Sequence, residues 1–192
     1  MNDTVSTLTA RNADFARHGF VPGRSLLPAL KTLVIGCVDS RVDPAHILGL
    51  ADGEAMVIRN IGGRWTPGAQ QTMAALRAIA EAEGGGGTPG PGWNLIVLQH
   101  TDCGITRLGG QPGLLADMFG IDATDLPARA AGDPRAAVAL DVAEIKANPL
   151  LPAEFIVSGL VYDVSTGLVE TVVAPAMLPE TGERGPGSRS QQ

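Results

Sequence analysis

The hydrophobic residues of this chain gather in short runs separated by polar and glycine-rich stretches, a pattern typical of an alternating α/β fold. Five of the runs are short and apolar enough to form strands. They cover residues 31–38, 54–58, 93–99, 155–161 and 168–174. The first three are nearly continuous, as expected of parallel strands that are buried on both faces. The fifth run follows the fourth after the short turn Ser165-Thr166-Gly167, so it is expected to return antiparallel beside it.

Three predicted helices begin with a residue that can cap a helix, followed directly by proline. These pairs are Asp43-Pro44, Thr66-Pro67 and Asp133-Pro134. The capping side chain accepts a hydrogen bond from a free backbone amide, and proline fits the first helical position. Helices that alternate with strands in this way predict a mostly parallel sheet flanked by helices. Its expected strand order is 2-1-3-4 plus an antiparallel fifth strand.

Apolar residues at helical spacing indicate which side of each predicted helix faces the core. They are Met73, Leu76 and either Ile79 or Ala80 in the second helix, and Val138, Val142 and Ile145 in the third. A weaker apolar face predicts one further short helix near the N-terminus. The residues of this face are Val5, Leu8, Asn12 and Phe15.

Length, composition and charge narrow the class of protein. A chain of 192 residues, 44% of them hydrophobic, is expected to form one domain over residues 1–178, followed by a disordered tail at 179–192. The net charge of −6 and the lack of a basic cluster argue against a nucleic-acid partner. No apolar run approaches the roughly 18 residues of a membrane span, and the first residues lack the apolar centre of a signal peptide. We therefore expect a cytoplasmic protein, not bound to membranes, whose two cysteines stay reduced.

Residues 85–90 match the dinucleotide-binding pattern G-x-G-x-x-G. A dinucleotide loop follows a strand and opens a helix, whereas this segment follows a predicted helix and precedes a strand. It also contains Pro89 and no lysine that could bind a phosphate. We therefore predict a flexible surface loop at this position rather than a cofactor site.

Three side chains that bind soft metals follow the ends of two predicted strands. Cys37 lies where the first strand ends, and His100 and Cys103 follow the third. Ligands bind outside the carboxyl ends of strands in open α/β sheets, and the order 2-1-3-4 makes these two strands neighbours. Two thiolates and one imidazole suit a tetrahedral Zn²⁺ ion, one per chain, with the fourth position open for catalysis. The alternatives are buried cysteines that act only as small apolar residues and a redox enzyme with a Cys37–Cys103 bond.

Asp39 and Arg41 lie two residues apart, just beyond Cys37. In a chain that leaves a strand, such side chains can point the same way and form a bidentate carboxylate–guanidinium pair. The plain interpretation is an ordinary surface ion pair. In the functional interpretation, Arg41 holds the Asp39 carboxylate where it accepts a hydrogen bond from water at the metal. Once released, Asp39 would take the fourth metal position and close the site.

These motifs resemble those of the β-class carbonic anhydrases, which carry them in the same order. The matching segments are Cys37-Val38-Asp39-Ser40-Arg41, Arg59-Asn60-Ile61-Gly62-Gly63 and His100-Thr101-Asp102-Cys103-Gly104. The likeness extends over about residues 32–174, which is nearly the whole predicted domain. The paired motifs are far more specific than a single H-x-x-C.

The resemblance implies a function and a role for each motif residue. Cys37, His100 and Cys103 would bind zinc, with Asp39 as a fourth ligand in a closed form. Asp39 and Arg41 would form the catalytic pair. The expected reaction is the reversible hydration of CO2 to bicarbonate and a proton, and the expected assembly is a homodimer or homotetramer.

One departure from the family keeps a second substrate class open. Ile61 stands where the family usually has alanine, and its bulk is expected to narrow or reshape the pocket. Hydrolysis of COS or CS2 on the same scaffold is therefore an alternative, because only access to the pocket separates these substrates from CO2. A non-catalytic zinc protein is the other alternative, and it would tolerate changes at Asp39 and Arg41.

Three further polar residues are candidate helpers of the reaction. His18 and His46 titrate in a range that suits proton transfer, but neither lies in a motif and both fit solvated surface positions. Asp102 lies between two expected metal ligands. It is expected to position its neighbours or to cap a helix rather than to act as a base.

Overall fold

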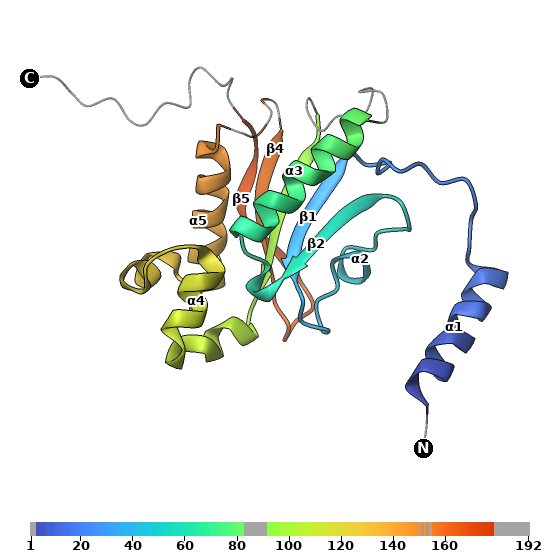
Figure 1. Cartoon of the computed structure of the whole chain (residues 1–192), viewed down its shortest axis with the longest axis horizontal. Helices are drawn as coiled ribbons and strands as arrows, with labels where there is room; N and C mark the ends of the chain where they lie inside the picture. Colours follow the sequence, from blue (N-terminus) through green and yellow to red (C-terminus); the bar gives the residue numbers. More distant parts are fainter. Residues whose placement is uncertain (1–2, 83–91, 150, 152, 154, 179–192) are drawn as a thin grey trace, which may run out of the picture.

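The computed structural model describes residues 3–82, 92–149, 151, 153 and 155–178, and these form one sheet of five strands (Figure 1). The strands are β1 (Thr32–Cys37), β2 (Ala55–Asn60), β3 (Asn94–His100), β4 (Ile156–Tyr162) and β5 (Val169–Met177). Their order is β2-β1-β3-β4-β5; the first four are parallel and β5 is antiparallel to β4. The predicted fold class and strand order are confirmed.

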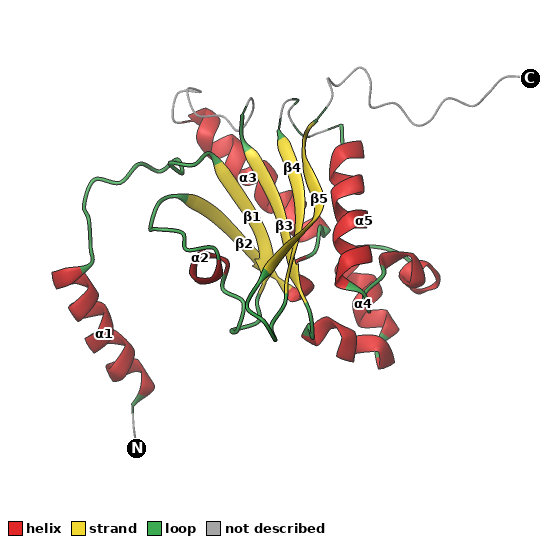
Figure 2. Cartoon of the chain, turned by 180° about the vertical axis from the view of Figure 1, so that it is seen from behind, coloured by secondary structure: helices red, strands yellow, loops and turns green. Residues whose placement is uncertain are grey.

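The predicted helix starts are also confirmed. The elements that begin at the three prolines are α2 (Pro44–Ile47), α3 (Pro67–Ala82) and α5 (Pro134–Ala147). Asp43 and Asp133 accept hydrogen bonds from backbone amides in the first turn of α2 and α5, and Thr66 accepts one from the amide of Ala69. α3 crosses in front of the strands in Figure 1 and behind them in Figure 2, and it shares one hydrophobic cluster with α5 and the sheet.

The faces of these two helices follow the predicted pattern with one choice resolved. Val138, Val142 and Ile145 of α5 are buried. In α3, Ala80 is buried, whereas Ile79 is 48% exposed. Of the two candidate positions, Ala80 therefore faces the sheet.

Several short elements were not predicted from the sequence. They are α4 (Pro112–Phe119) and the 3-10 turns η1 (Ile61–Gly63), η2 (Gly104–Gly110) and η3 (Ala123–Arg129). η1 and η2 follow β2 and the loop after β3, so they surround the carboxyl ends of the central strands. These turns carry several of the residues of the candidate site.

The N-terminal helix α1 (Thr4–His18) lies apart from the sheet in both views (Figures 1 and 2). It has the predicted apolar face, but none of its residues is buried, and Val5, Leu8 and Phe15 are exposed. No helix in the described ranges is both long and apolar enough to cross a bilayer. The predicted surface loop at 85–90 and the predicted tail at 179–192 lie outside the described residues.

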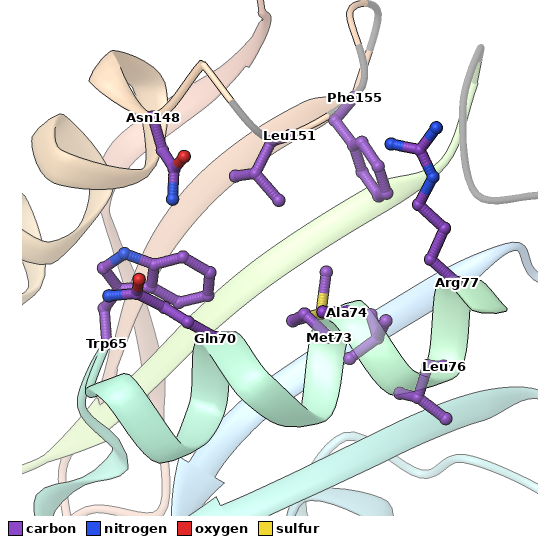
Figure 3. Close-up of a pocket in the computed structure, with 10 residues that line it drawn as sticks. Trp65, Gln70, Met73, Ala74, Leu76, Arg77, Asn148, Leu151 and Phe155 are labelled. Atoms are coloured by element: carbon purple, nitrogen blue, oxygen red, sulfur yellow. The ribbon is translucent and has the colours of Figure 1, made fainter.

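An apolar hollow of about 90 Å³ lies between α3 and the starts of β1 and β4 (Figure 3). Leu33, Met73, Leu151 and Phe155 are among the side chains that line it, and Trp65 closes one end. We call it the apolar hollow below. It lies at the opposite end of β1 from Cys37.

Candidate metal centre and active site

The structure brings together the three side chains that were expected to bind metal. Cys37 is the last residue of β1, His100 is the last residue of β3, and Cys103 follows three positions later. Because β1 and β3 are parallel neighbours, their carboxyl ends meet at the same edge of the sheet. One ligand atom from each of the three residues lies within 4.8 Å of the others, and all three residues are buried. We call Cys37, His100 and Cys103 the ligand group.

The hydrogen bonds of His100 leave one ring nitrogen free for a metal. Nδ1 lies 2.9 Å from the backbone oxygen of Thr101 and donates to it when it carries the ring proton. Nε2 is buried and has no hydrogen-bond partner among the described residues. A metal-binding histidine commonly donates through one nitrogen to a carbonyl so that the other faces the ion.

The two thiols form a hydrogen bond with each other, and this bond shifts their pKa values in opposite directions. Their sulfur atoms are 3.7 Å apart. The hydrogen bond from Cys103, helped by His100 and by the amides of Asp39 and Gly62, lowers the pKa of Cys37 far below that of a free thiol. The same hydrogen bond, together with burial, raises the pKa of Cys103. Burial opposes the charged form of His100, but the adjacent Cys37 outweighs it, so the pKa of His100 is raised.

The donor set and its spacing fit zinc. Zinc in proteins prefers sulfur and imidazole nitrogen ligands, and catalytic sites use three protein ligands. Two Zn–S bonds of about 2.3 Å at a tetrahedral angle place their sulfurs about 3.8 Å apart. The separation of 3.7 Å between Cys37 and Cys103 agrees with that value. It is too long for a disulfide, and both cysteines are free.

The turn η1 helps to position Cys37. The amide of Gly62 donates to the sulfur of Cys37 over 3.3 Å. Gly62 and Gly63 have φ angles of +81° and +62°, a region that favours glycine. A Cβ atom on Gly63 would lie 2.7 Å from the backbone oxygen of Leu98 and 3.0 Å from the backbone nitrogen of Cys37. Only glycine therefore lets this turn pack against the ends of β1 and β3.

Asp39 and Arg41 form the expected pair. Arg41 donates to the Asp39 carboxylate from its backbone amide at 2.9 Å, from Nε at 3.1 Å and from Nη2 at 2.8 Å. These bonds hold the pKa of Asp39 well below its usual range, so the carboxylate is ionised and can only accept hydrogen bonds. Arg41 also donates to Asp102, to its carboxylate at 3.0 Å and to its backbone oxygen at 3.0 Å. Asp102 therefore contacts Arg41 and helps to position it, as expected. The backbone of Asp102 has a positive φ of 51°.

Arg59 fixes the backbone between the ligand group and this pair. Its Nε donates to the backbone oxygen of Cys37 at 2.8 Å, and its Nη2 donates to that of Asp39 at 2.7 Å. Its Nη1 forms an ion pair with Asp43, the cap of α2, at 2.6 Å. One side chain from β2 thus supports the whole segment from Cys37 to α2.

A hollow of about 290 Å³, which we call the metal-side hollow, opens beside the ligand group. Cys37, Asp39 and Cys103 form part of its wall, and the other side chains in it are Val38, Ile61, Ile105 and Leu108. Apart from the two thiols and one carboxylate, these side chains are apolar. Such a lining suits a small apolar molecule that approaches the ligand group.

A buried ion pair that was not predicted from the sequence lies behind the site. Arg64 donates to Asp141 through Nε at 2.8 Å and through Nη2 at 3.0 Å, and both side chains are almost fully buried. Gln99, the neighbour of His100, donates to the same carboxylate at 3.0 Å. The Arg64 guanidinium also lies 4.8 Å from the ring centre of Phe119. This network links the end of β3 to α5.

The two remaining histidines lie outside the ligand group. His18 is exposed on α1, where its Nδ1 is 3.1 Å from the backbone oxygen of Asp14. His46 is exposed on α2. Both agree with the solvated surface positions expected from the sequence.

Comparisons with known proteins agree with this geometry. A family model described as carbonic anhydrase matches residues 32–114. Beta-carbonic anhydrase 1 of Mycobacterium tuberculosis is 30% identical over 165 residues, which is 85% of this chain and 94% of the relative. The crystal structure of a carbonic anhydrase from Streptococcus mutans has a TM-score of 0.63 and 32% identity, covering 90% of this chain and 98% of that one. A carbon disulfide hydrolase of Saccharolobus solfataricus is 28% identical over 162 residues, 69% of this chain and 72% of the relative.

A mostly parallel sheet with two cysteines and a histidine at its carboxyl edge defines the general class, an α/β protein with a zinc-type ligand set. The similarity over nearly the whole length of its relatives defines the family. The chain belongs to the β-class carbonic anhydrase family.

Proposed function

We propose that this chain is a zinc-dependent carbonic anhydrase that catalyses the reversible hydration of CO2 to bicarbonate and a proton. The observation that carries the proposal is the buried ligand group, in which His100 Nε2 has no hydrogen-bond partner in the described part of the chain, next to the Asp39–Arg41 pair. One zinc ion per chain would be held by Cys37, His100 and Cys103. When bound, zinc supplies a Lewis acid that lowers the pKa of a water ligand from about 16 to about 7.

The side chains around the ligand group have distinct proposed roles. The ionised Asp39 carboxylate accepts a hydrogen bond from the attacking water, which turns a lone pair of that water toward CO2. Arg41 keeps the carboxylate in this orientation through its bonds to both oxygens. The apolar side chains of the metal-side hollow admit CO2, which offers few groups for hydrogen bonding. In a closed form, Asp39 would leave Arg41 and take the fourth metal position.

The test combines zinc content with stopped-flow CO2 hydration. Cys37→Ser is expected to lose the metal and the activity, and Asp39→Ala to keep the metal but turn over poorly. Asp52→Ala serves as the control because Asp52 is an exposed carboxylate with one ion pair to Arg24, at 3.7 Å. Equal activity in all of these proteins would reject the proposal, and retained activity in Asp39→Ala with full zinc would favour a different role for Asp39.

The second candidate function is hydrolysis of COS or CS2 at the same site. The relative from Saccharolobus solfataricus, named a carbon disulfide hydrolase, is the observation that favours it. The carbonic anhydrase relative is more similar in sequence and covers more of this chain, so we place CO2 hydration first. Release of sulfide from COS, measured on the preparation used for CO2, separates the two activities. A non-catalytic zinc protein would show neither.

The proposal extends to domain organisation, assembly and compartment. We propose one catalytic domain over residues 1–178 that assembles into a homodimer or homotetramer. The exposed apolar residues Val5, Leu8 and Phe15 on the separate helix α1 support an assembly in which this helix is covered. Two free cysteines at a metal-type site suit the reducing cytoplasm, where we place the protein.

A further inference from the structure

The rim and the base of the metal-side hollow are formed by different isoleucines. Ile61, the first residue of η1, is 41% exposed, whereas Ile105 is only 4% exposed. Ile61 therefore forms part of the rim, and Ile105 lies at the base beside the buried thiols. Cys37 in the same wall is only 4% exposed, so Ile61 lies nearer to solvent than this thiol does.

The turn that carries Ile61 has little freedom to move away from the hollow. The next residue, Gly62, is tied to the sulfur of Cys37 by its amide at 3.3 Å. A Cβ atom on Gly62 would lie 2.8 Å from Ile105 Cδ1, and one on Gly63 would lie 2.7 Å from the backbone oxygen of Leu98. The turn is thus packed against both the base of the hollow and the end of β3. The backbone of Ile61 therefore keeps a fixed place relative to the ligand group, so a shorter side chain at this position would leave more room at the rim.

We infer that Ile61 is a specificity-determining residue that favours CO2 over the larger molecules COS and CS2. This inference rests on the proposed function and deepens it by naming the side chain that selects the substrate. Sulfur is larger than oxygen, and a C=S bond is longer than a C=O bond, so the sulfur compounds need more room on the same approach. A difference of one methylene group in an apolar pocket changes discrimination between substrates by about 10- to 200-fold.

Hydrolysis of COS can use the same groups of the site as hydration of CO2. The oxygen of water adds to the carbon of COS, the C–S bond breaks, and the electron pair of that bond leaves on sulfur. The sulfur takes up the two protons of water, so one COS and one water give one CO2 and one hydrogen sulfide. No oxidant or reductant takes part, and the same water attacks carbon in both reactions. Discrimination therefore depends on which molecule reaches the ligand group.

The test measures kcat/KM for COS hydrolysis, followed by sulfide release, and for CO2 hydration on zinc-loaded protein. The ratio of the COS value to the CO2 value is expected to rise at least about tenfold in Ile61→Ala. Ile61→Val should give a smaller rise in the same direction, and it covers the case in which Ile61→Ala does not fold. Ile79→Ala is the matched control, because Ile79 is 48% exposed on α3 and does not line the hollow. Its ratio should equal that of the wild type.

Three results would overturn the inference, and the assays distinguish them. An unchanged ratio in both Ile61 variants, with zinc and CO2 hydration present in the wild type, overturns the role of Ile61 alone. A wild-type protein with a higher kcat/KM for COS than for CO2 also overturns the role of Ile61. If zinc-loaded wild type acts on neither molecule, the proposed function fails and the inference fails with it.

Discussion

The two ends of strand β1 lead to two largely apolar hollows that differ in their reactive side chains. Leu33, near the start of β1, lines the apolar hollow, whereas Cys37, its last residue, lines the metal-side hollow. The apolar hollow has mainly packing residues in its walls (Figure 3). The metal-side hollow combines two thiols and a carboxylate with a fixed glycine turn. An apolar hollow alone therefore indicates packing, whereas reactive side chains gather where parallel strands end.

This comparison predicts a separation of effects. Substitutions at the carboxyl ends of the strands should change metal binding and activity, with little effect on the stability of the metal-free protein. Substitutions in the core and at the apolar hollow should change stability and leave the activity of the folded protein intact.

The largest expected effect is on activity, at the ligand group. Cys103→Ser is expected to lose zinc and to lower CO2 hydration by more than about 100-fold, because the metal is the source of the nucleophile. The measurements are zinc content, stopped-flow hydration and urea unfolding of the chelated proteins. The chelated wild type and variant should unfold at similar urea concentrations. Full activity in Cys103→Ser would show that Cys103 is not needed to hold a catalytic metal, and it would contradict the proposed difference between the two ends of β1.

The largest expected effect on stability comes from the buried ion pair behind the site. Asp141→Ala leaves the Arg64 guanidinium buried without its carboxylate, which should lower the free energy of unfolding by about 3–5 kcal/mol. Urea denaturation measures this change. Arg77→Ala is the control, because its ion pair with Glu81 is half exposed and contributes less than about 0.5 kcal/mol. Equal losses in the two variants would contradict the account.

A packing residue of the apolar hollow should affect stability only. Met73 is 7% exposed, and Met73→Ala removes buried methylene groups next to existing empty space. We expect a loss of about 2–3 kcal/mol, the lower part of the range for such substitutions. CO2 hydration by the folded variant should equal that of the wild type in stopped-flow assays. A large loss of activity would show that the two ends of β1 are coupled.

Zinc affinity should fall as the pH falls. Zinc needs both thiolates, and the raised pKa of Cys103 means that this proton is still bound at neutral pH. Zinc must displace it, so the Kd should rise about tenfold for each unit of pH decrease, and more steeply below the raised pKa of His100, whose proton zinc must then displace as well. Cys37, whose pKa is lowered, has already lost its proton and adds nothing to this slope. Competition with a chelator at several pH values measures the slope, and a flat profile would contradict the raised pKa of the Cys103 thiol.

The smallest expected effect is at Asp102. Its carboxylate is half exposed and supports Arg41 from the outside. Asp102→Asn keeps the backbone acceptor for Arg41, so CO2 hydration should fall by less than about fivefold, as is typical for exposed ion pairs. Steady-state kinetics of CO2 hydration by Asp102→Asn, compared with those of Asp39→Ala, measures this effect. A loss as large as that of Asp39→Ala would assign Asp102 a direct part in the reaction.

Much of the fold could be predicted because its signals are local. Short apolar runs identified all five strands, and Asp43, Thr66 and Asp133 before proline identified three helix starts. The short helix α4 and the three 3-10 turns were missed, because they are too short to show an apolar period, and η1 and η2 are also rich in glycine. Their positions depend on tertiary contacts such as that between Gly62 and Ile105.

The candidate site likewise has some residues that local sequence signals predict and others that depend on tertiary contacts. Cys37, His100 and Cys103 could be grouped from the sequence because each follows a predicted strand and the strand order places those ends together. The Arg64–Asp141 pair spans 77 positions and belongs to no local motif. One signal could have found it: Asp141 lies on the apolar face of α5, between Val138 and Val142. A carboxylate on such a face needs a buried partner.

Zinc K-edge X-ray absorption of the purified protein tests the central claim most directly, because it counts the atoms around the metal. The account predicts one zinc ion per chain with two sulfur ligands at about 2.3 Å and two nitrogen or oxygen ligands at about 2.0–2.1 Å. A spectrum without sulfur ligands, or with four of them, would contradict the assignment of Cys37, His100 and Cys103 as an open catalytic site.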